Sequence, residues 1–240
     1  MKRASIVLLH GWGLSGSTFE PLAAELTKRG YRVFTPDFPG FGLSTMPAKP
    51  LRLSDYAAFL HDYLTKNTIQ EPIVIGHSFG GRVALKYQFL YPKSVRALIL
   101  SGTPGFTPIN RKKLLLFILL AKIGKAFFSL PPFHLMQDTV RRWYYYLVGA
   151  RDFYRAEGVM RETFKHIVQE DLLQSMSTVT MPCLLVWGEA DTIVPLSVAE
   201  KMKNVISDAR LEIVQGEDHG VPFKNPKVFA DYVTAFLLSL

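Results

Sequence analysis

The sequence predicts an α/β protein built on a mostly parallel sheet of about six strands, and three observations support this fold class. Six short aliphatic runs recur along the chain, each followed by a turn. These runs are nearly continuous rather than alternating, which is typical of strands that are buried on both faces. Segments with helical periodicity separate most of them. The six runs are SIVLLHG, YRVFTPD, EPIVIGHS, VRALILSG, CLLVWGE and ARLEIVQG.

The segments between the runs carry helix signals. Residues 17–20 and 197–200 both have the pattern Ser-x-x-Glu, which is typical of a capping box and predicts a helix start at each place. In the stretch LSDYAAFLHDYLTKN, Tyr56, Leu60, Tyr63 and Leu64 recur on one helical face. We therefore expect helices to flank the sheet on both sides.

The segment from Thr103 to about Thr180 has no convincing strand signal. It is too long for a loop in a compact domain, and it is rich in helix formers and aromatic residues. We expect residues 104–180 to form a helical cap, or lid, inserted over one end of the sheet. Residues 1–103 and 181–240 would then form the core.

The composition is that of a globular protein, with 48% hydrophobic and 20% charged residues, but its basic charge is unevenly distributed. Between Pro104 and Ser175 there are eleven Lys and Arg and six Asp and Glu, which is +5 of the net +8. This pattern fits either a solvated edge on a buried cap helix or a basic rim for an acidic carrier or an anionic lipid surface. We expect no nucleic-acid partner, because no nucleic-acid-binding module is recognisable.

The number of cysteines and the length of the longest apolar run indicate in which cellular compartment the protein resides. The one cysteine, Cys183, lies in an apolar run, which predicts a buried inert thiol and excludes an intrachain disulfide. The longest apolar run, residues 114–121, would span roughly 12 Å as a helix against a bilayer core of about 30 Å. We therefore expect a cytoplasmic protein that is not transmembrane. No cluster of His and Cys has metal-ligand spacing, so we also expect no metal and no cofactor.

The stretch Gly76-His77-Ser78-Phe79-Gly80 places a serine between glycines at the turn from a predicted strand to a predicted helix. This turn lies at the carboxyl edge of a parallel sheet, where ligands bind. Small neighbours allow a sharp turn and keep the hydroxyl of Ser78 exposed. The pattern G-x-S-x-G in this context is typical of a nucleophile elbow.

A serine nucleophile needs a base, and His219 is the best placed of the six histidines. It follows the last strand-like run, in QGEDHGVPF, at the same sheet edge as Ser78. His77 occupies the variable position of the elbow and is expected to point away. The others lie at the end of the first strand, in a helix or in the insertion: His10, His61, His134 and His166.

The acid that orients the base should follow another strand at this edge. In CLLVWGEADTIVP we choose Asp191, which comes just after the turn, with Glu189 as the alternative. Asp218 adjoins His219 in sequence and is expected to point elsewhere. The order Ser78, Asp191, His219 is the nucleophile-acid-histidine order of one hydrolase fold.

An oxyanion hole would complete the site, with hydrogen-bond donors aimed at the developing negative charge. The backbone N–H of Phe79, directly after the serine, is one candidate. The backbone N–H of Trp12, in the glycine-containing loop HGWGLSG after the first strand, is the other. The same loop could also serve simply as a turn between strand and helix.

Taken together, these motifs resemble the α/β-hydrolase fold superfamily over essentially the whole chain. HGWG, DFPGFGLS, GHSFGG, GEADTIVP and DHGVPF stand in the family's order and approximate spacing. The resemblance implies a Ser-His-Asp hydrolase with a helical cap between two late strands, and it implies that Trp12 and Phe79 supply the oxyanion donors. Relatives with aspartate at the elbow are disfavoured by Ser78. Many members begin with an antiparallel hairpin before the HG strand, whereas here that strand starts within the first few residues. We therefore expect a minimal sheet of about six parallel strands.

The function that follows is a serine esterase, which cleaves carboxylic esters with apolar acyl or aromatic groups through an acyl-enzyme. The same residues would also suit a thioesterase, an acyl-carrier methyl-ester hydrolase or a C–C bond hydrolase. A non-catalytic ligand receptor on the same scaffold is the rival from a different class. Such a receptor would bind ligands tightly without releasing p-nitrophenol from any acyl ester.

Overall fold

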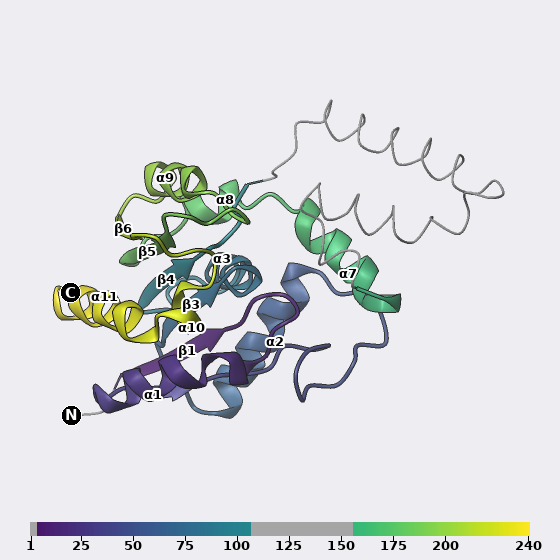
Figure 1. Cartoon of the computed structure of the whole chain (residues 1–240). Coiled ribbons are helices and arrows are strands. Elements are labelled where there is room, and N and C mark those ends of the chain that lie inside the picture. Colours follow the sequence, from purple (N-terminus) through teal and green to yellow (C-terminus); the bar gives the residue numbers. More distant parts are fainter. Residues whose placement is uncertain (1–3, 107–155) are drawn as a thin grey trace, which may run out of the picture.

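The computed structural model describes residues 4–106 and 156–240, and within them it contains one six-stranded sheet (Figure 1). All neighbouring strands are parallel, in the order β2-β1-β3-β4-β5-β6. Each strand falls in one of the six predicted aliphatic runs, so the predicted fold class is confirmed. The strands are β1 (Ser5–Leu9), β2 (Arg32–Phe34), β3 (Ile73–His77), β4 (Ala97–Ser101), β5 (Cys183–Gly188) and β6 (Ala209–Val214).

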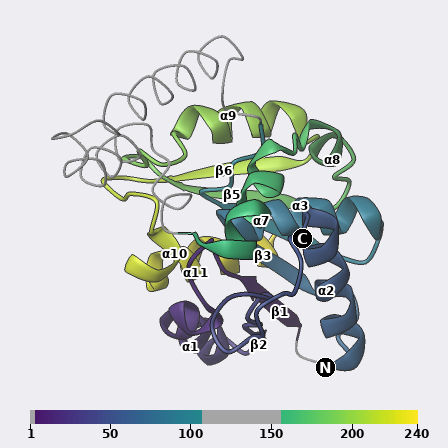
Figure 2. The same ribbon diagram turned by 90° about the vertical axis from the view of Figure 1, so that its right-hand side faces the viewer.

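Helices cover both faces of the sheet and form a three-layer structure (Figures 1 and 2). One face packs against α1 (Glu20–Lys28) and α11 (Pro226–Leu238), which also contact each other. The other face packs against α2 (Leu53–Lys66), α3 (Phe79–Leu90) and α9 (Leu196–Val205). The shorter or peripheral elements are the 3₁₀ turn η1 (Gly16–Phe19), α7 (Gly158–Gln169), α8 (Leu173–Ser177) and α10 (Val221–Lys224).

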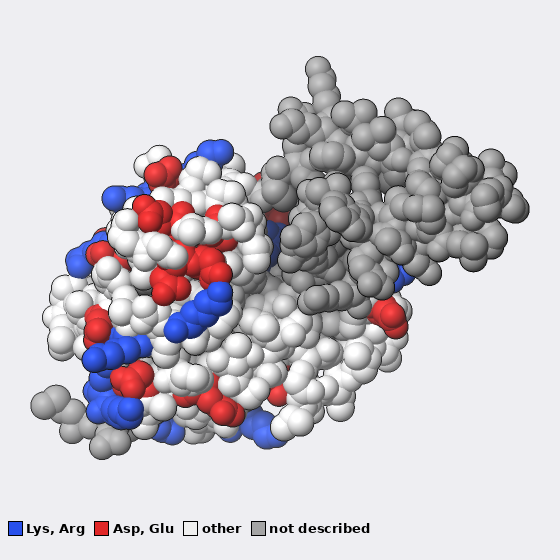
Figure 3. Space-filling view, viewed as in Figure 1, with Lys and Arg blue, Asp and Glu red and all other residues white. Residues whose placement is uncertain are grey.

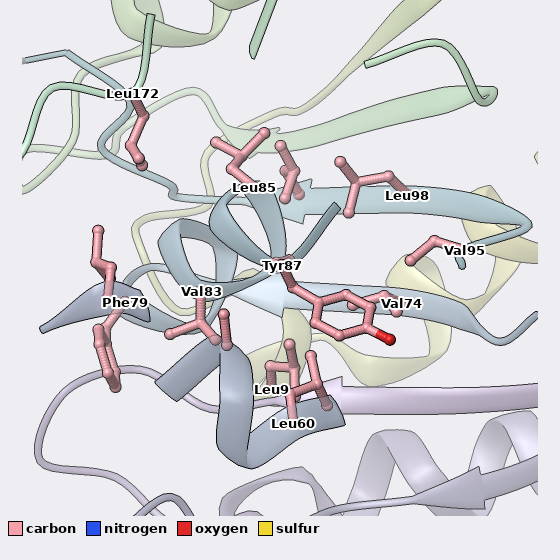
Figure 4. Close-up of a cluster of buried hydrophobic side chains, with 14 of the residues drawn as sticks. Leu9, Leu60, Val74, Phe79, Val83, Leu85, Tyr87, Val95, Leu98 and Leu172 are labelled. Atoms are coloured by element: carbon pink, nitrogen blue, oxygen red, sulfur yellow. The ribbon is translucent and has the colours of Figure 1, made fainter. Parts of the chain in front are cut away.

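The four inner strands β1, β3, β4 and β5 are continuous in their apolar character because both of their faces are buried, whereas the edge strands β2 and β6 are partly exposed. In β1 the side chains of Val7 and Leu9 pack toward α2 and α3, whereas Ile6 and Leu8 pack toward α1 and α11. Figure 4 shows the first of these two cores, where residues from neighbouring strands lie against α2 and α3. Burial on both faces holds these strands in the middle layer, and their carboxyl ends lie together at one edge of the sheet.

Both predicted capping boxes are wrong, although helices do follow. The chain enters α1 through the 3₁₀ turn η1, where the N–H of Gly16 donates to the carboxylate of Asp37 at 2.6 Å. The cap position of η1 is Ser15 and that of α1 is Phe19, so Ser17 caps neither. Helix α9 begins at Leu196 directly after Pro195, and no side chain caps it. The predicted buried face of α2 is confirmed for Tyr56, Leu60 and Leu64, while Tyr63 is partly exposed.

The predicted helical cap at residues 104–180 falls largely on residues 107–155, which lie outside the described residues, as do most of its basic side chains. The described remainder contains α7 and α8. The hydroxyl of Thr163 in α7 accepts the N–H of Leu51 at 3.0 Å. Met160 packs so closely on Gly40 that a Cβ there would lie 2.6 Å from its sulfur. Helix α7 is therefore seated on the loop between β2 and α2.

Arg82 in α3 ties the two described ends of this insertion to the core. Its guanidinium donates to the carbonyl oxygens of Pro104, Ile167 and Glu170, the Ile167 bond measuring 2.7 Å. One turn later, Lys86 pairs with the Glu170 carboxylate at 2.9 Å. Arg82 is 3% exposed, and burial lowers its pKa to about 10, so it remains charged at neutral pH. The guanidinium thus replaces water for three carbonyls in the protein interior.

We predict that Arg82→Met lowers the free energy of unfolding by about 2–4 kcal/mol, because it leaves three backbone carbonyls without their donor. The exposed Arg96 offers a matched control, and Arg96→Met should change stability by less than about 0.5 kcal/mol. Urea unfolding at pH 7, followed by circular dichroism, measures both. Equal losses for the two variants would contradict the anchoring role of Arg82.

Candidate active site

Ser78 stands at a strained turn between β3 and α3, with φ of 52° and ψ of −115°. The glycines around it are required by close packing. A Cβ at Gly80 would clash with the carbonyl of Leu9 at the end of β1, and a Cβ at Gly76 would lie 2.5 Å from the Cα of Gly81. The G-x-S-x-G pattern therefore marks a point where the start of a helix is pressed against two strand ends.

The same turn leaves Ser78 accessible while everything around it is covered. From Pro72 to Leu85, Ser78 is the one residue that is not buried. Its own N–H donates to the carbonyl of Ser101 in β4 at 2.9 Å, so the backbone is fixed and the hydroxyl is presented outward. The amino terminus of the twelve-residue helix α3 begins at the next residue, which favours negative charge beside the serine.

Asp191 and His219 meet at this edge of the sheet. The His219 Nδ1 atom and the Asp191 Oδ2 atom are 2.8 Å apart. The other carboxylate oxygen accepts the N–H groups of Ile193 and Val194, at 2.9 and 2.8 Å. The Asp191 side chain is 1% exposed and that of His219 is 14% exposed. A buried, fully bonded carboxylate thus fixes the imidazole and leaves one edge of its ring accessible.

Neighbouring packing holds this pair in place. The indole N–H of Trp187 donates to the carbonyl of Val194 at 2.8 Å, which closes the loop around Asp191. A Cβ at Gly188, the last residue of β5, would clash with the carbonyls of Glu217 and Asp218. Glycine there lets the loop after β6 approach the end of β5 and brings His219 to Asp191.

The two other acids that adjoin the site are engaged elsewhere. The Glu189 carboxylate accepts the N–H of Gly216 at 3.1 Å, so it faces the turn after β6 rather than His219. Asp218 pairs with Lys224 and accepts the N–H of Gly220 at 2.9 Å. The hydrogen bond from Lys224, followed by that from Gly220, lowers the pKa of Asp218. Of these acids, Asp191 alone bonds His219.

His77 is the neighbour that sequence reasoning missed. Its ring is 1% exposed, and its centroid lies 4.7 Å from that of His219, at an interplanar angle of 53°. It also makes an edge contact with Phe223 at 5.3 Å. Burial, and then the nearby His219 ring, lower the pKa of His77 to about 3. Its place at the variable position of the elbow indicated only that this side chain should point away from the serine. The partner it meets there comes from a loop 142 residues later in the numbering.

The loop after β1 lies directly beside Ser78, since a Cβ at Gly11 would be 3.4 Å from the Ser78 Cβ. His10 fixes this loop from below. Its Nε2 accepts the N–H of Phe38 at 3.1 Å, so its Nδ1 carries the proton and donates to the Gly11 carbonyl at 2.8 Å. Burial lowers the pKa of His10 and keeps the ring neutral. Among the described residues, the N–H of Trp12 in this loop donates to no partner.

Aromatic rings gather next to the serine. The indole of Trp12 makes edge contacts with Phe41, Phe79 and Phe164, with centroid distances of 4.9, 5.5 and 5.0 Å. Phe164 belongs to α7, so this cluster joins the loop after β1 to the described part of the predicted cap. The side of the site formed by these rings is therefore apolar.

Acidic side chains gather on one part of the described surface, over the region of β5, β6 and α9 (Figure 3).

The described residues give no sign of a metal centre or a membrane span. Within residues 4–106 and 156–240, no group of three His, Cys, Asp or Glu could hold a metal ion. Cys183 is buried, as predicted, and burial raises the pKa of its thiol. No helix in the described ranges is long and apolar enough to cross a membrane.

Comparison with known proteins shows the family to which this fold belongs. The sequence pattern of the alpha/beta hydrolase family matches residues 6–232, and the chain belongs to this family. An AB hydrolase superfamily protein of Bacillus subtilis is 26% identical, over 96% of this chain and 90% of its own. Lipase 3 of a Moraxella species is also 26% identical, over 89% and 71%.

Solved structures agree with this fold. An esterase from Exiguobacterium antarcticum superposes with a TM-score of 0.75 at 22% identity, covering 97% of this chain and 91% of its own. A bromoperoxidase from Bacillus anthracis also gives 0.75, at 21% identity, over 98% and 92%. At these identities the likeness concerns the fold.

We predict that Ser78→Gly is more stable than Ser78→Ala by about 1 kcal/mol. Alanine keeps the Cβ that strains a backbone at positive φ, whereas glycine accepts this conformation and loses only some chain entropy. Urea unfolding of the two variants at pH 7 measures the difference. A more stable alanine variant would contradict the strain inferred from the backbone.

We also predict a loss of stability in acid that depends on His77. Its pKa is lowered on folding, so below about pH 6.5 the unfolded chain binds a proton that the folded chain refuses, and stability falls as pH falls. Between pH 7 and pH 5 the cost at this one site is about 2 kcal/mol. Urea midpoints at the two pH values should show a smaller acid loss for His77→Phe than for the wild type. An unchanged acid loss would be the contrary result.

Proposed function

We propose that this protein is a serine hydrolase that cleaves carboxylic esters through an acyl-enzyme. The observation that carries the proposal is the hydrogen bond between Asp191 and His219, formed at the sheet edge where Ser78 is the one residue between Pro72 and Leu85 that is not buried. A nucleophile, a base and an orienting acid are the groups that acyl transfer requires. Curated relatives named as lipases and as a putative esterase support a hydrolase of this kind.

In the proposed reaction, the Ser78 hydroxyl oxygen attacks the ester carbonyl carbon while His219 Nε2 takes the hydroxyl proton. Asp191 accepts the Nδ1–H of the ring, holds its orientation and stabilises the imidazolium that forms. The tetrahedral intermediate expels the alcohol, which receives the proton from His219. Water then attacks the acyl carbonyl carbon while His219 takes a proton from it. The second tetrahedral intermediate breaks its bond to the Ser78 oxygen, which receives that proton, and the acid is released.

The developing oxyanion would be bound by the backbone N–H groups of Trp12 and Phe79. In the described part of the chain neither group donates a hydrogen bond, so both are free to bind an oxygen. Phe79 is the first residue of α3, and its N–H belongs to the unsatisfied amino terminus of that helix. The neutral ring of His10 supports the loop that carries Trp12. Each such donor contributes about 3–4 kcal/mol to transition-state stabilisation.

The apolar rings around Trp12 favour substrates with apolar acyl or aromatic groups. We also propose that residues 104–180 act as a cap over this site, with residues 1–103 and 181–240 as the core. The contact between Phe164 and Trp12 and the anchoring of both insertion ends by Arg82 support this division. The acyl length that fits is then set partly by residues of the cap.

Hydrolysis of p-nitrophenyl acetate, butyrate and octanoate tests the proposal, with the burst of p-nitrophenol measured by stopped flow. We expect a burst from the wild type, none from Ser78→Ala, and a kcat lower by about 10³- to 10⁴-fold for Asp191→Asn, which would favour the wrong imidazole tautomer. Ser94→Ala, a serine in a distant turn, is the matched control and should keep wild-type rates.

Mass spectrometry after treatment with a fluorophosphonate should place the label on Ser78. Turnover that survives Ser78→Ala would contradict the assignment of the nucleophile. Tight binding of the esters by the wild type, with no burst at any acyl length, would instead favour the non-catalytic receptor.

A further inference from the structure

The buried ring of His77 has no role in the proposed reaction, although it precedes Ser78 in the chain and contacts the ring of His219. It is the last residue of β3, directly before Ser78, and it pairs in register with Ser101 of β4. The centroid of its imidazole lies 4.7 Å from that of the His219 imidazole and 5.3 Å from that of the Phe223 ring. Its Nδ1 atom has no hydrogen-bond partner among the described residues. A buried polar atom without a partner is costly, which calls for an explanation.

The glycines at the neighbouring strand ends show how closely this ring is enclosed. A Cβ at Gly11 would lie 3.2 Å from His77 Cδ2, and a Cβ at Gly102 would lie 3.4 Å from His77 Cε1. The same Cβ at Gly102 would lie 2.6 Å from His219 Cε1 and 2.7 Å from its Nδ1. The His219 ring therefore packs closely against the backbone at Gly102 and contacts the ring of His77.

This confinement bears on the bond to Asp191. The carboxylate fixes only one atom of the imidazole, Nδ1, and a single hydrogen bond permits the ring to tilt about it. Packing on the ring faces is what restricts such tilting. The backbone at Gly102 and the buried ring of His77 both contact the His219 ring, and together they form the slot in which it sits.

The charge of the groups around the His219 ring also matters, because His219 becomes an imidazolium during the proposed reaction. The titratable groups near it are the Asp191 carboxylate, His77, and Asp218 of its own loop, whose carboxylate is bonded to Lys224 and to the Gly220 N–H. A cationic side chain at position 77 would oppose the imidazolium. Burial keeps His77 neutral at physiological pH, so the ring restricts His219 without repelling its charged form.

We propose that His77 is a positioning residue for His219. The ring of His77 holds the His219 imidazole in the plane that bonds Asp191 and faces Ser78. It touches neither the substrate nor the reacting atoms. The catalytic consequence rests on the proposed function, whereas the alignment itself does not. The plainer alternative is that His77 only fills space in the core.

Proton NMR of the intact protein tests the alignment without any substrate. The Nδ1–H of His219, shared with Asp191, should give a far-downfield resonance that disappears in His219→Gln. We expect His77→Ala to lose this resonance or to accelerate its exchange with water at least about tenfold, because the open slot lets the ring tilt. His77→Phe restores a flat ring without nitrogen atoms and should retain the resonance.

A control separates alignment from loss of stability. Tyr87→Ala removes a buried ring of α3 whose aromatic neighbours are His61 and Tyr91, away from His219. It should lower the thermal midpoint while leaving the resonance unchanged. The proposal is overturned if His77→Ala keeps the wild-type resonance and exchange rate, if the Tyr87 variant loses them equally, or if the wild type shows no such resonance.

Ester hydrolysis then separates this inference from the proposed function. In an active enzyme, His77→Ala should lower kcat by about 10- to 100-fold with KM within about twofold, and His77→Phe should recover most of kcat. If the wild type hydrolyses no ester but the NMR pattern is as expected, the proposed function fails and the positioning role stands. An unchanged kcat in an active His77→Ala enzyme would overturn the positioning role.

Discussion

The close approach of α3 to the ends of β1 and β3 is the constraint on which the site depends. Glycine at positions 76 and 80 lets the first turn of the helix contact the Leu9 carbonyl and the strand it has just left. The price of this packing is a strained backbone at Ser78, and the buried sheet and helices on either side sustain it. A side chain forced out of the core at this point is presented at the carboxyl edge of the sheet, with the amino terminus of a helix beneath it.

Three histidines meet at this edge, and their surroundings give them different tasks. His10 is buried, and its two nitrogen atoms are both engaged by backbone groups that fix the loop after β1. His219 is the one bonded to a carboxylate, and it keeps part of its ring accessible. His77 is buried beside it with an unpartnered nitrogen. Two buried rings thus differ from a third that is partly accessible and bonded to a carboxylate, a division that follows from burial and bonding rather than from residue type.

Much of the fold could be predicted because it depends on local patterns. The six aliphatic runs correspond to the six strands, and the four inner strands are buried on both faces, which needs continuous apolar sequence. The chain order of Ser78, Asp191 and His219 was informative for a similar reason: each follows a strand, and parallel strands end at a common edge. The helix starts could not be predicted in the same way. The donor at Gly16 is satisfied by Asp37, and no local pattern at residues 17–20 reveals a partner so distant in sequence.

The sequence by itself determined the class of fold, the elbow serine and the loops that should carry an acid and a base, because strand burial and tight turns leave residue patterns that are read locally. Only the tertiary structure decided which carboxylate bonds His219, since Asp191, Glu189 and Asp218 all adjoin the same edge and differ in the backbone groups they meet. It also decided that His77 contacts His219 and that Arg82 holds both ends of the insertion. These contacts join segments far apart in the chain, and their geometry arises from packing, which no spacing of residue types encodes.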